Sequence, residues 1–304
     1  MIDPVPGPPT RSPRPETREI TELRAVKVRS PELSDAVDMH IELLELQRRV
    51  SSRVPLPPLD LDANVFHRHQ LEGRPLLSFE HIPLDLTDLR LMVRQTAEVL
   101  HRFDALDDAE FQLIHTLGRD MRLLTLVGHW YRRPAERVAA ERLAAVGASG
   151  IGPQAHAGPA EAELEIVGHV LALAMRPFLA RCAEVLQRHP ELPSWTHSHC
   201  ALCGGEPDLA VVTASADRNL VCGRCLLQWR FDPVACPFCL NSDRARVTSF
   251  GTNDGQYRVY GCDVCHRYLK AFDARRGARP FMPVMDGVAM LPLDAAAIQR
   301  GYTS

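Results

Sequence analysis

Eight of the nine cysteines of this chain fall into four Cys-x-x-Cys pairs between residues 200 and 265. The eight residues are Cys200, Cys203, Cys222, Cys225, Cys236, Cys239, Cys262 and Cys265. A gap of two residues lets both thiolates of a pair face one metal ion from a tight turn, and two pairs complete a tetrahedral site. The four pairs therefore predict two metal sites, each with four thiolate ligands.

The spacing between the pairs predicts which of them share a metal. The first and second pairs are separated by 18 residues, and the third and fourth by 22. Both gaps lie at or near the spacing of about 15–20 residues in zinc ribbons, and each can hold one hairpin. A crossed arrangement would need longer, interleaved loops, so we expect sequential pairing.

The cysteine pattern does not choose between zinc and iron, because four thiolates suit both metals. Gly204 follows the second cysteine of the first pair, where a glycine lets the backbone turn back toward the sulfur. The other three pairs have Leu226, Leu240 and His266 at this position. We therefore expect the first site to be the more rubredoxin-like and the second to be structural, with two metal ions, iron or zinc, as the cofactors.

Other interpretations of the cysteines are less favoured. Disulfides and redox dithiols do not explain four matched pairs in a chain that has intracellular features. Residues 262–266 match the Cys-x-x-Cys-His signature of c-type haem attachment, but that attachment needs an exported chain. His197 and His199 could replace a thiolate, although a solvated linker explains them more simply. The ninth cysteine, Cys182, is expected to be a small core residue of a helix.

The overall composition of the 304 residues is that of a soluble globular protein, with 45% hydrophobic and 24% charged residues. The formal net charge of −3 gives no reason to expect nucleic acid or an anionic membrane as a partner. The first 15 residues carry six prolines and no apolar run, and no later stretch reaches 18 uninterrupted apolar residues. We expect a cytoplasmic protein with no membrane insertion.

The change of pattern along the chain predicts an α+β protein. Residues 1–16 are expected to be a disordered tail and residues 17–190 an α-helical domain. Residues 191–230 should form the first four-cysteine ribbon, and residues 231–304 the second ribbon with a C-terminal tail. The fold class is thus an N-terminal α-helical domain followed by two consecutive rubredoxin-like or zinc-ribbon modules.

Hydrophobic periodicity gives the individual elements. Helices are expected from residue 30 to the prolines at 55–58, then at 85–103, 108–131, 134–147 and 160–188. Short strands are expected at 209–213, 218–221, 228–231, 246–250 and 256–260, mostly close to a cysteine turn. A closing segment at 283–302 is expected to pack a final helix against the body.

The charge of the ribbon region argues against nucleic acid as a partner. Residues 195–304 contain 12 Arg and Lys and 10 Asp and Glu, a formal charge of +2. Two four-thiolate sites, each around a divalent ion, would bring the region to about −2. Arg275, Arg276 and Arg279 form the one basic group of note, and a solvated turn explains them equally well.

The ribbon residues resemble those of the formate dehydrogenase accessory protein family, FdhE. The resemblance begins with Cys200-x-x-Cys203-Gly204, Pro207 and Cys222-x-x-Cys225-x-x-x-Trp229. It continues with Cys236-Pro237-x-Cys239, Cys262-Asp263-x-Cys265-x-x-Tyr268-Leu269-Lys270 and a tail from Asp286 to Tyr302. It covers about residues 190–304. Ala201 stands where the family usually has proline, and Leu240 and His266 where it tends to have glycine.

This resemblance implies a cytoplasmic accessory or maturation factor that is not an enzyme. Such proteins are described as binding the catalytic subunit of formate dehydrogenase and assisting its assembly or activation before export, with rubredoxin-like modules that bind iron or zinc. One alternative is a redox protein that uses four-cysteine iron sites. A nucleic-acid-binding zinc-ribbon protein is a weaker alternative. The sequence leaves the redox activity of the sites, the partner-binding surface and self-association open.

Overall fold

The structure is a computed structural model that describes residues 17–59, 61–134, 159–277 and 279–303. The predicted tail at 1–16 lies outside these residues, and so does the predicted helix at 134–147 apart from its first residue. The described part is a helical N-terminal region followed by a sheet-rich region, so the predicted α+β class is confirmed. The boundaries between domains remain predictions.

Helices form the N-terminal region, and two short helices close the chain. The helices of the N-terminal region are α1 (Arg18–Arg29), α2 (Ser34–Ser51), α3 (Ala63–Glu72), α4 (Leu86–Arg102), α5 (Asp108–Leu117) and α7 (Pro159–Leu186). The C-terminal helices are α8 (Pro283–Ala289) and α9 (Leu291–Gln299). Residues 123–134 are also helical. Helices α1 and α3 were not predicted from the sequence.

The predicted single helix at 108–131 is wrong, because the chain breaks between α5 and residue 123. Helix α5 starts with a capping box in which Asp107 and Glu110 bond each other's backbone N–H. It ends at Leu117, and the Asp120 carboxylate then accepts a hydrogen bond from the Arg122 N–H at 2.7 Å. An aspartate that bonds the backbone two residues later favours a turn over a continuous helix.

Six strands form one sheet in the order β3-β2-β1-β6-β5-β4. They are β1 (Pro207–Val212), β2 (Arg218–Cys222), β3 (Gln228–Phe231), β4 (Val247–Gly251), β5 (Tyr257–Cys262) and β6 (Tyr268–Asp273). The first five match the predicted strands closely, whereas β6 was missed. Strands β1 and β6 pair in parallel, with Ala210 opposite Ala271, and this pairing joins the two cysteine-bearing halves into one sheet.

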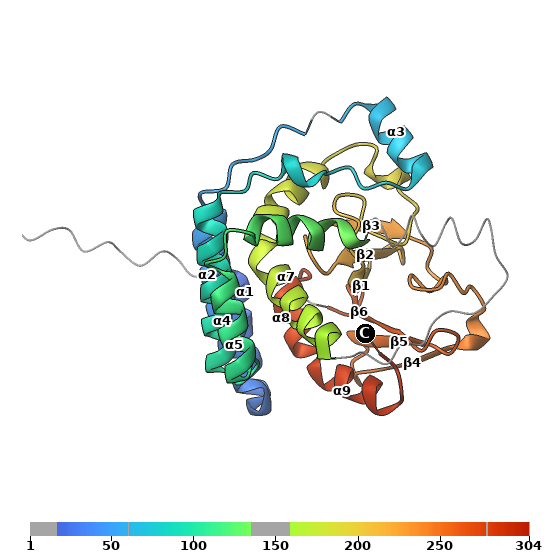
Figure 1. The fold of residues 1–304 in the computed structure, drawn as a ribbon. Helices are drawn as coiled ribbons and strands as arrows, with labels where there is room; N and C mark the ends of the chain where they lie inside the picture. The colour runs from blue at the N-terminus through green and yellow to red at the C-terminus, as the bar shows by residue number, and fades with distance from the viewer. Residues whose placement is uncertain (1–16, 60, 135–158, 278, 304) are drawn as a thin grey trace, which may run out of the picture.

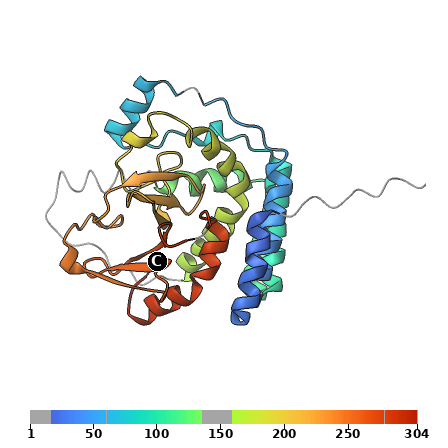
Figure 2. The same cartoon turned by 180° about the vertical axis from the view of Figure 1, so that it is seen from behind.

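Helices cover the sheet on both faces. Helices α1, α2, α4 and α5 lie side by side at one edge of the molecule, with α7 between them and the strands (Figure 1; Figure 2 shows the same arrangement from behind). One face of the sheet joins the main hydrophobic core of the helices through Ala210, Leu220 and Leu269. The alternate residues Leu209 and Val211 face the C-terminal segment, as the period of two along a strand requires.

Helix α7 is the central helix of the main core. Its buried side chains include Leu171, Phe178 and Leu186, and Pro177 lies within it. Residues 165–186 are long and apolar enough to cross a membrane by length and composition, but half of this window is buried against other elements. A core helix has the same composition, so the hydropathy of α7 is weak evidence for a membrane span.

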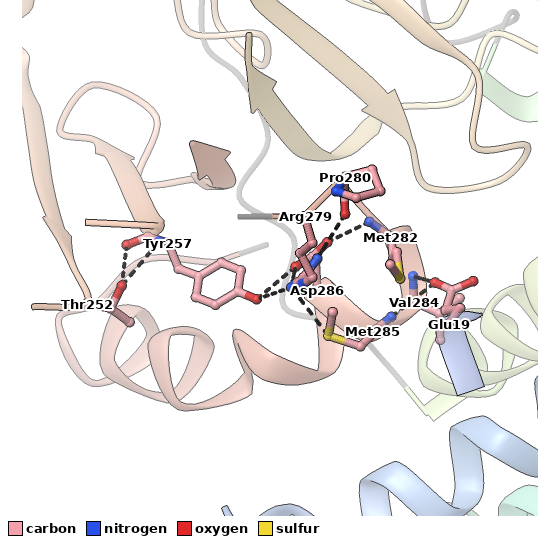
Figure 3. A network of polar contacts seen from close by, with 9 residues as sticks. All are labelled: Glu19, Thr252, Tyr257, Arg279, Pro280, Met282, Val284, Met285 and Asp286. Atoms are coloured by element: carbon pink, nitrogen blue, oxygen red, sulfur yellow. Dashed lines mark hydrogen bonds and ion pairs between the residues drawn. The ribbon is translucent and has the colours of Figure 1, made fainter. Parts of the chain in front are cut away.

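A buried polar network ties the two ends of the chain together (Figure 3). The fully buried Asp286 carboxylate accepts hydrogen bonds from Arg279 at 2.5 Å, from the Tyr257 hydroxyl at 2.8 Å and from the Met282 N–H at 2.7 Å. Glu19 of α1 accepts hydrogen bonds from the first N–H groups of α8. Burial raises the pKa of Glu19, against the effect of these two bonds. The N-terminal helix is therefore fixed to the C-terminal segment.

We expect Asp286→Ala to lower the free energy of unfolding by about 3 kcal/mol, because it leaves the Arg279 guanidinium without its buried partner. Urea unfolding of the metal-loaded protein measures this change. Asp38→Ala is the matched control, because Asp38 pairs with Lys27 where both side chains are about 40% exposed. The control should change stability by no more than about 0.5 kcal/mol. Equal losses in the two variants would contradict the assigned role of Asp286.

Candidate metal centres

The first four-cysteine cluster consists of Cys200, Cys203, Cys222 and Cys225. The Sγ atoms of Cys200 and Cys225 lie 3.5 Å apart, and those of Cys203 and Cys222 lie 3.6 Å apart. Cys203 and Cys225 are 3.7 Å apart. Strands β1 and β2 bring the two pairs together, since Pro207 lies opposite Cys222 in the sheet.

The second cluster consists of Cys236, Cys239, Cys262 and Cys265. The Sγ distances are 3.8 Å between Cys236 and Cys265 and 3.6 Å between Cys239 and Cys262. Strand β5 delivers Cys262 at its end, whereas Cys236 and Cys239 lie on the loop after β3. The structure thus groups the eight predicted cysteines sequentially and not in the crossed arrangement.

The distances within both clusters fit a tetrahedral four-thiolate site. Sulfur ligands about 2.3 Å from a tetrahedral centre lie about 3.8 Å from one another. The observed separations of 3.5–3.8 Å are close to this value and far from the disulfide bond length of about 2.05 Å. Each cluster could therefore hold one metal ion, and the donor set suits zinc and iron equally.

All four cysteine turns have the same backbone hydrogen bonds. In each, the N–H after the second cysteine donates to the carbonyl of the first cysteine, at 2.9 Å in the turn that starts at Cys200 and 2.8 Å in the turn that starts at Cys262. The N–H of the first cysteine then donates to the carbonyl five residues later, at 2.8–3.0 Å in the four turns. We call these four turns the knuckles.

The shared geometry requires a left-handed residue in every knuckle. The φ angle is 70° at Gly204, 63° at Leu226, 62° at Leu240 and 55° at His266. Residues with a Cβ atom adopt this conformation at a cost of about 1–2 kcal/mol. The glycine pattern predicted that the two sites would differ. Their backbones do not differ, because the knuckles without glycine adopt the same left-handed turn at the cost of strain.

The two clusters differ in burial instead. Each cysteine of the first cluster is at most 1% exposed and belongs to the main hydrophobic core. In the second cluster Cys239 and Cys265 are accessible to solvent. The exposed side chains of Leu240 and Val264 flank them on the same knuckles. The first site is therefore an interior site, and the second is a surface site.

One thiol in each cluster ionises more readily than a buried cysteine should. Burial opposes ionisation of Cys222, but hydrogen bonds from the other three thiols lower its pKa well below the ordinary value. Burial likewise opposes ionisation of Cys262, but the N–H groups of Cys265 and Val264 lower its pKa. A metal ligand must be deprotonated, so these lowered pKa values favour metal binding at both clusters.

The helical region holds the first cluster from two sides. The N–H groups of Leu76 and Leu77 donate to the carbonyls of Ala201 and Leu202, at 2.8 and 2.9 Å. On the second knuckle, the Arg224 guanidinium lies 4.0 Å from the ring centre of Trp130 and donates to the backbone carbonyl of that residue. These contacts could not be predicted from the sequence pattern, because they join residues far apart in the chain.

The histidines before the first knuckle have a structural position. Nε2 of His197 lies 2.6 Å from the Gln70 carbonyl, and Nε2 of His199 lies 3.0 Å from the Gly73 carbonyl. They are not a solvated linker as predicted, because His199 is buried and His197 is half-buried. Cys182 is fully buried in α7, as expected, and burial raises the pKa of its thiol to about 12.

The C-terminal residues enclose the last knuckle. The Thr303 N–H donates to the His266 carbonyl, and the Tyr302 hydroxyl donates to the Asp263 carboxylate at 2.5 Å. The Tyr302 ring lies so close to Gly261 that a Cβ atom there would meet it at 2.6 Å. The chain end therefore fixes the backbone of the second cluster.

The fold and the two clusters define an α+β protein with two four-cysteine metal-binding centres, one interior and one at the surface. The crystal structure of the FdhE protein from Pseudomonas aeruginosa has a similar fold, with a TM-score of 0.58 over 94% of this chain and 91% of that chain, at 18% identity. A curated protein of Haemophilus ducreyi, named an FdhE homolog, is 28% identical over 134 residues. The aligned part covers 43% of this chain and 43% of that relative. No family model matches the chain.

These findings confirm the resemblance to the formate dehydrogenase accessory protein family that the cysteine motifs indicated. The fold similarity covers nearly all of both chains, whereas the sequence similarity spans less than half the length of the curated relative. The structural neighbour therefore supports the fold, and the curated relative supports the family likeness.

Substitution of the strained residue Leu240 should distinguish backbone from side-chain effects, because its side chain is 63% exposed. We expect Leu240→Gly to raise the free energy of unfolding by up to about 1 kcal/mol, since glycine avoids the left-handed strain. Leu240→Val should lower it by about 1 kcal/mol, because a β-branched residue fits this conformation worst. Thermal unfolding of the metal-loaded variants measures both. A Leu240→Gly variant less stable than Leu240→Val would refute the role of the backbone strain.

Proposed function

We propose that this protein is a cytoplasmic, non-catalytic accessory protein of formate dehydrogenase that binds the catalytic subunit of that enzyme and assists its assembly or activation before export. The observation that carries the proposal is the pair of four-cysteine clusters on four equivalent knuckles, within a fold similar to that of an FdhE protein. The relatives supply the link to formate dehydrogenase, and the clusters supply the chemistry expected of the modules.

The eight cysteines of the two clusters are the proposed metal ligands, four to each ion. Zinc would supply a structural cross-link at these sites, and iron would add one-electron chemistry. The protein's own contribution is the geometry of the knuckles, whose backbone hydrogen bonds orient the two sulfur atoms of each pair toward one point. The buried first cluster then stabilises the junction between helices and sheet, and the second supports an exposed surface.

The second cluster offers a surface suited to a protein partner. Leu240 is 63% exposed and Val264 is 48% exposed, and both lie on knuckles of this cluster. Exposed apolar side chains on a rigid backbone favour protein contacts, because little conformational entropy is lost on binding. We propose that the catalytic subunit contacts the surface around Leu240 and Val264.

Loss of a single cysteine should separate the two sites. We expect Cys200→Ser to unfold the protein and to lose at least one metal equivalent, because the first cluster lies in the main core and structural zinc contributes on the order of 10 kcal/mol to the folding of small domains. Cys239→Ser should remove one equivalent and leave the helices intact. Metal analysis of anaerobically purified protein, with circular dichroism, measures both effects.

The control for these variants is Cys182→Ala, which should keep two metal equivalents because Cys182 lies outside both clusters. A Cys239→Ser variant that retains two equivalents would contradict the assignment of ligands.

The same metal analysis tests the second candidate function, a redox protein, which the exposed cysteines of the second cluster favour. A preparation that contains zinc alone and no iron would exclude it.

Co-purification with the catalytic subunit of formate dehydrogenase tests the partner directly. We expect the wild-type protein to retain the subunit and the double variant Leu240→Asp/Val264→Asp to lose at least about tenfold in affinity, because buried carboxylates would remain without partners. Leu71→Glu is the control, since Leu71 is 71% exposed on α3 and does not belong to the knuckles of the second cluster. No association of the wild-type protein in cells that express the enzyme would refute the proposal.

A further inference from the structure

A cavity of about 410 Å³ lies beside the second cluster, on the face of the sheet opposite α9. Its floor is formed by side chains of five strands, among them Arg218 of β2 and Tyr260 of β5. The loop that carries Cys236 and Phe238 forms another wall. Its volume lies in the range of small-molecule sites, about 300–1,000 Å³.

Arginines are the charged side chains of this cavity apart from the cysteine ligands Cys236 and Cys262. Four arginines line it, and none of the described residues that line it is acidic. Arg267 is held by two hydrogen bonds to Glu206, at 3.1 and 2.9 Å, and Arg275 by its pair with Asp273. Among the described carboxylates, none forms an ion pair with Arg218 or with Arg244 of the cavity rim. Within the described residues Arg218 and Arg244 thus have no direct ion pair, and the Asp232 carboxylate acts on both only at longer range.

Arg218 is the most unusual of these residues, because it is only 7% exposed. One of its terminal nitrogens donates to the backbone carbonyls of Asp232 and Ala235. Its Nε is buried and has no hydrogen-bond partner in the described part of the chain. A buried donor without a hydrogen-bond partner is unfavourable, and a bound anion would remove this cost.

The remaining walls are apolar. The Arg267 guanidinium lies over the Phe238 ring, 3.8 Å from the centre of that ring. Leu269 is buried in the floor of the cavity. The half-buried Tyr260 adds an aromatic surface. Apolar walls with a few convergent cations suit a molecule that has a charged head and an apolar body.

A structural explanation for the arginines also exists. Burial lowers the pKa of Arg218, and the Asp232 carboxylate and the Cys236 thiolate oppose this effect by favouring its charged form. Arg218 could therefore serve as the countercharge to the second cluster. The Asp232 carboxylate interacts electrostatically with Arg244 as well. These interactions account for the charges of the two arginines but not for the apolar space that Phe238, Tyr260 and Leu269 line beside them.

We propose that this cavity binds a small organic anion, with a carboxylate or phosphate head at Arg218 and Arg244 and an apolar ring or chain against Phe238, Tyr260 and Leu269. The ligand would lie beside the second cluster, because Cys236 and Cys262 line the same cavity. This site is independent of the proposed binding of formate dehydrogenase.

Isothermal titration of the full-length, metal-loaded protein with three probes tests the proposal. Benzoate and phenyl phosphate share a ring and differ in the head group, and inorganic phosphate lacks the ring. We expect one of the two ring compounds to bind at least about tenfold more tightly than inorganic phosphate. The better of the two identifies the head group. No binding by either ring compound, or equal binding of all three probes, would overturn the proposal.

Two substitutions locate the binding. Arg244→Ala should weaken the better probe about tenfold, because it removes a charge-assisted hydrogen bond. Arg246→Ala is the matched control: it lies on the same short 3-10 helix, does not line the cavity and bonds the Asp263 carbonyl. Arg218→Met should abolish binding if the variant folds, as circular dichroism will show. Unchanged affinity in Arg244→Ala, or equal losses in Arg244→Ala and Arg246→Ala, would overturn the site.

Discussion

Four thiols converge inside the main hydrophobic core, and much of the structure depends on this convergence. Ionised sulfur atoms in an apolar interior are unfavourable unless a metal neutralises them, so this position commits the fold to a closed site. The helical region reinforces it, because the Leu76 and Leu77 N–H groups bond the knuckle that carries Ala201. Arg224 on the next knuckle holds the Trp130 carbonyl. The cluster thus joins the helices to the sheet.

The parallel pairing of β1 with β6 connects the sheet around the first cluster to the strands that carry the second cluster. It makes one sheet from two halves that the sequence presents as separate ribbons, and the ligands of the second cluster come from the loop after β3, from the end of β5 and from the turn that follows β5. The chain ends then fix the remaining edges. Glu19 bonds the start of α8, and Tyr302 packs over Gly261 behind the last knuckle. The second site is therefore rigid although two of its cysteines reach solvent, a combination that suits contact with another molecule.

Much of the site could be predicted from the chain alone. The Cys-x-x-Cys spacing sets the knuckle, and the gaps of 18 and 22 residues set the sequential grouping that the structure has. Five strands follow from short β-prone runs near the cysteines. Helices α1 and α3 were missed. The break after Leu117 was not predicted either, because the local hydrogen bonds of Asp120 outweigh a periodic apolar pattern. The glycine pattern misled as well, since Leu226, Leu240 and His266 adopt the left-handed turn without it.

The sequence by itself determined the donor atoms and their pairing, because both depend on short spacings along the chain. Only the tertiary structure decided that one cluster is interior and the other superficial, because burial is set by packing between segments such as 76–77 and 201–202. The arginine-lined cavity is likewise a feature that only the tertiary structure decided. Arg218, Arg244 and Tyr260 are unremarkable in sequence, and they share one cavity because strands from both halves form a single sheet.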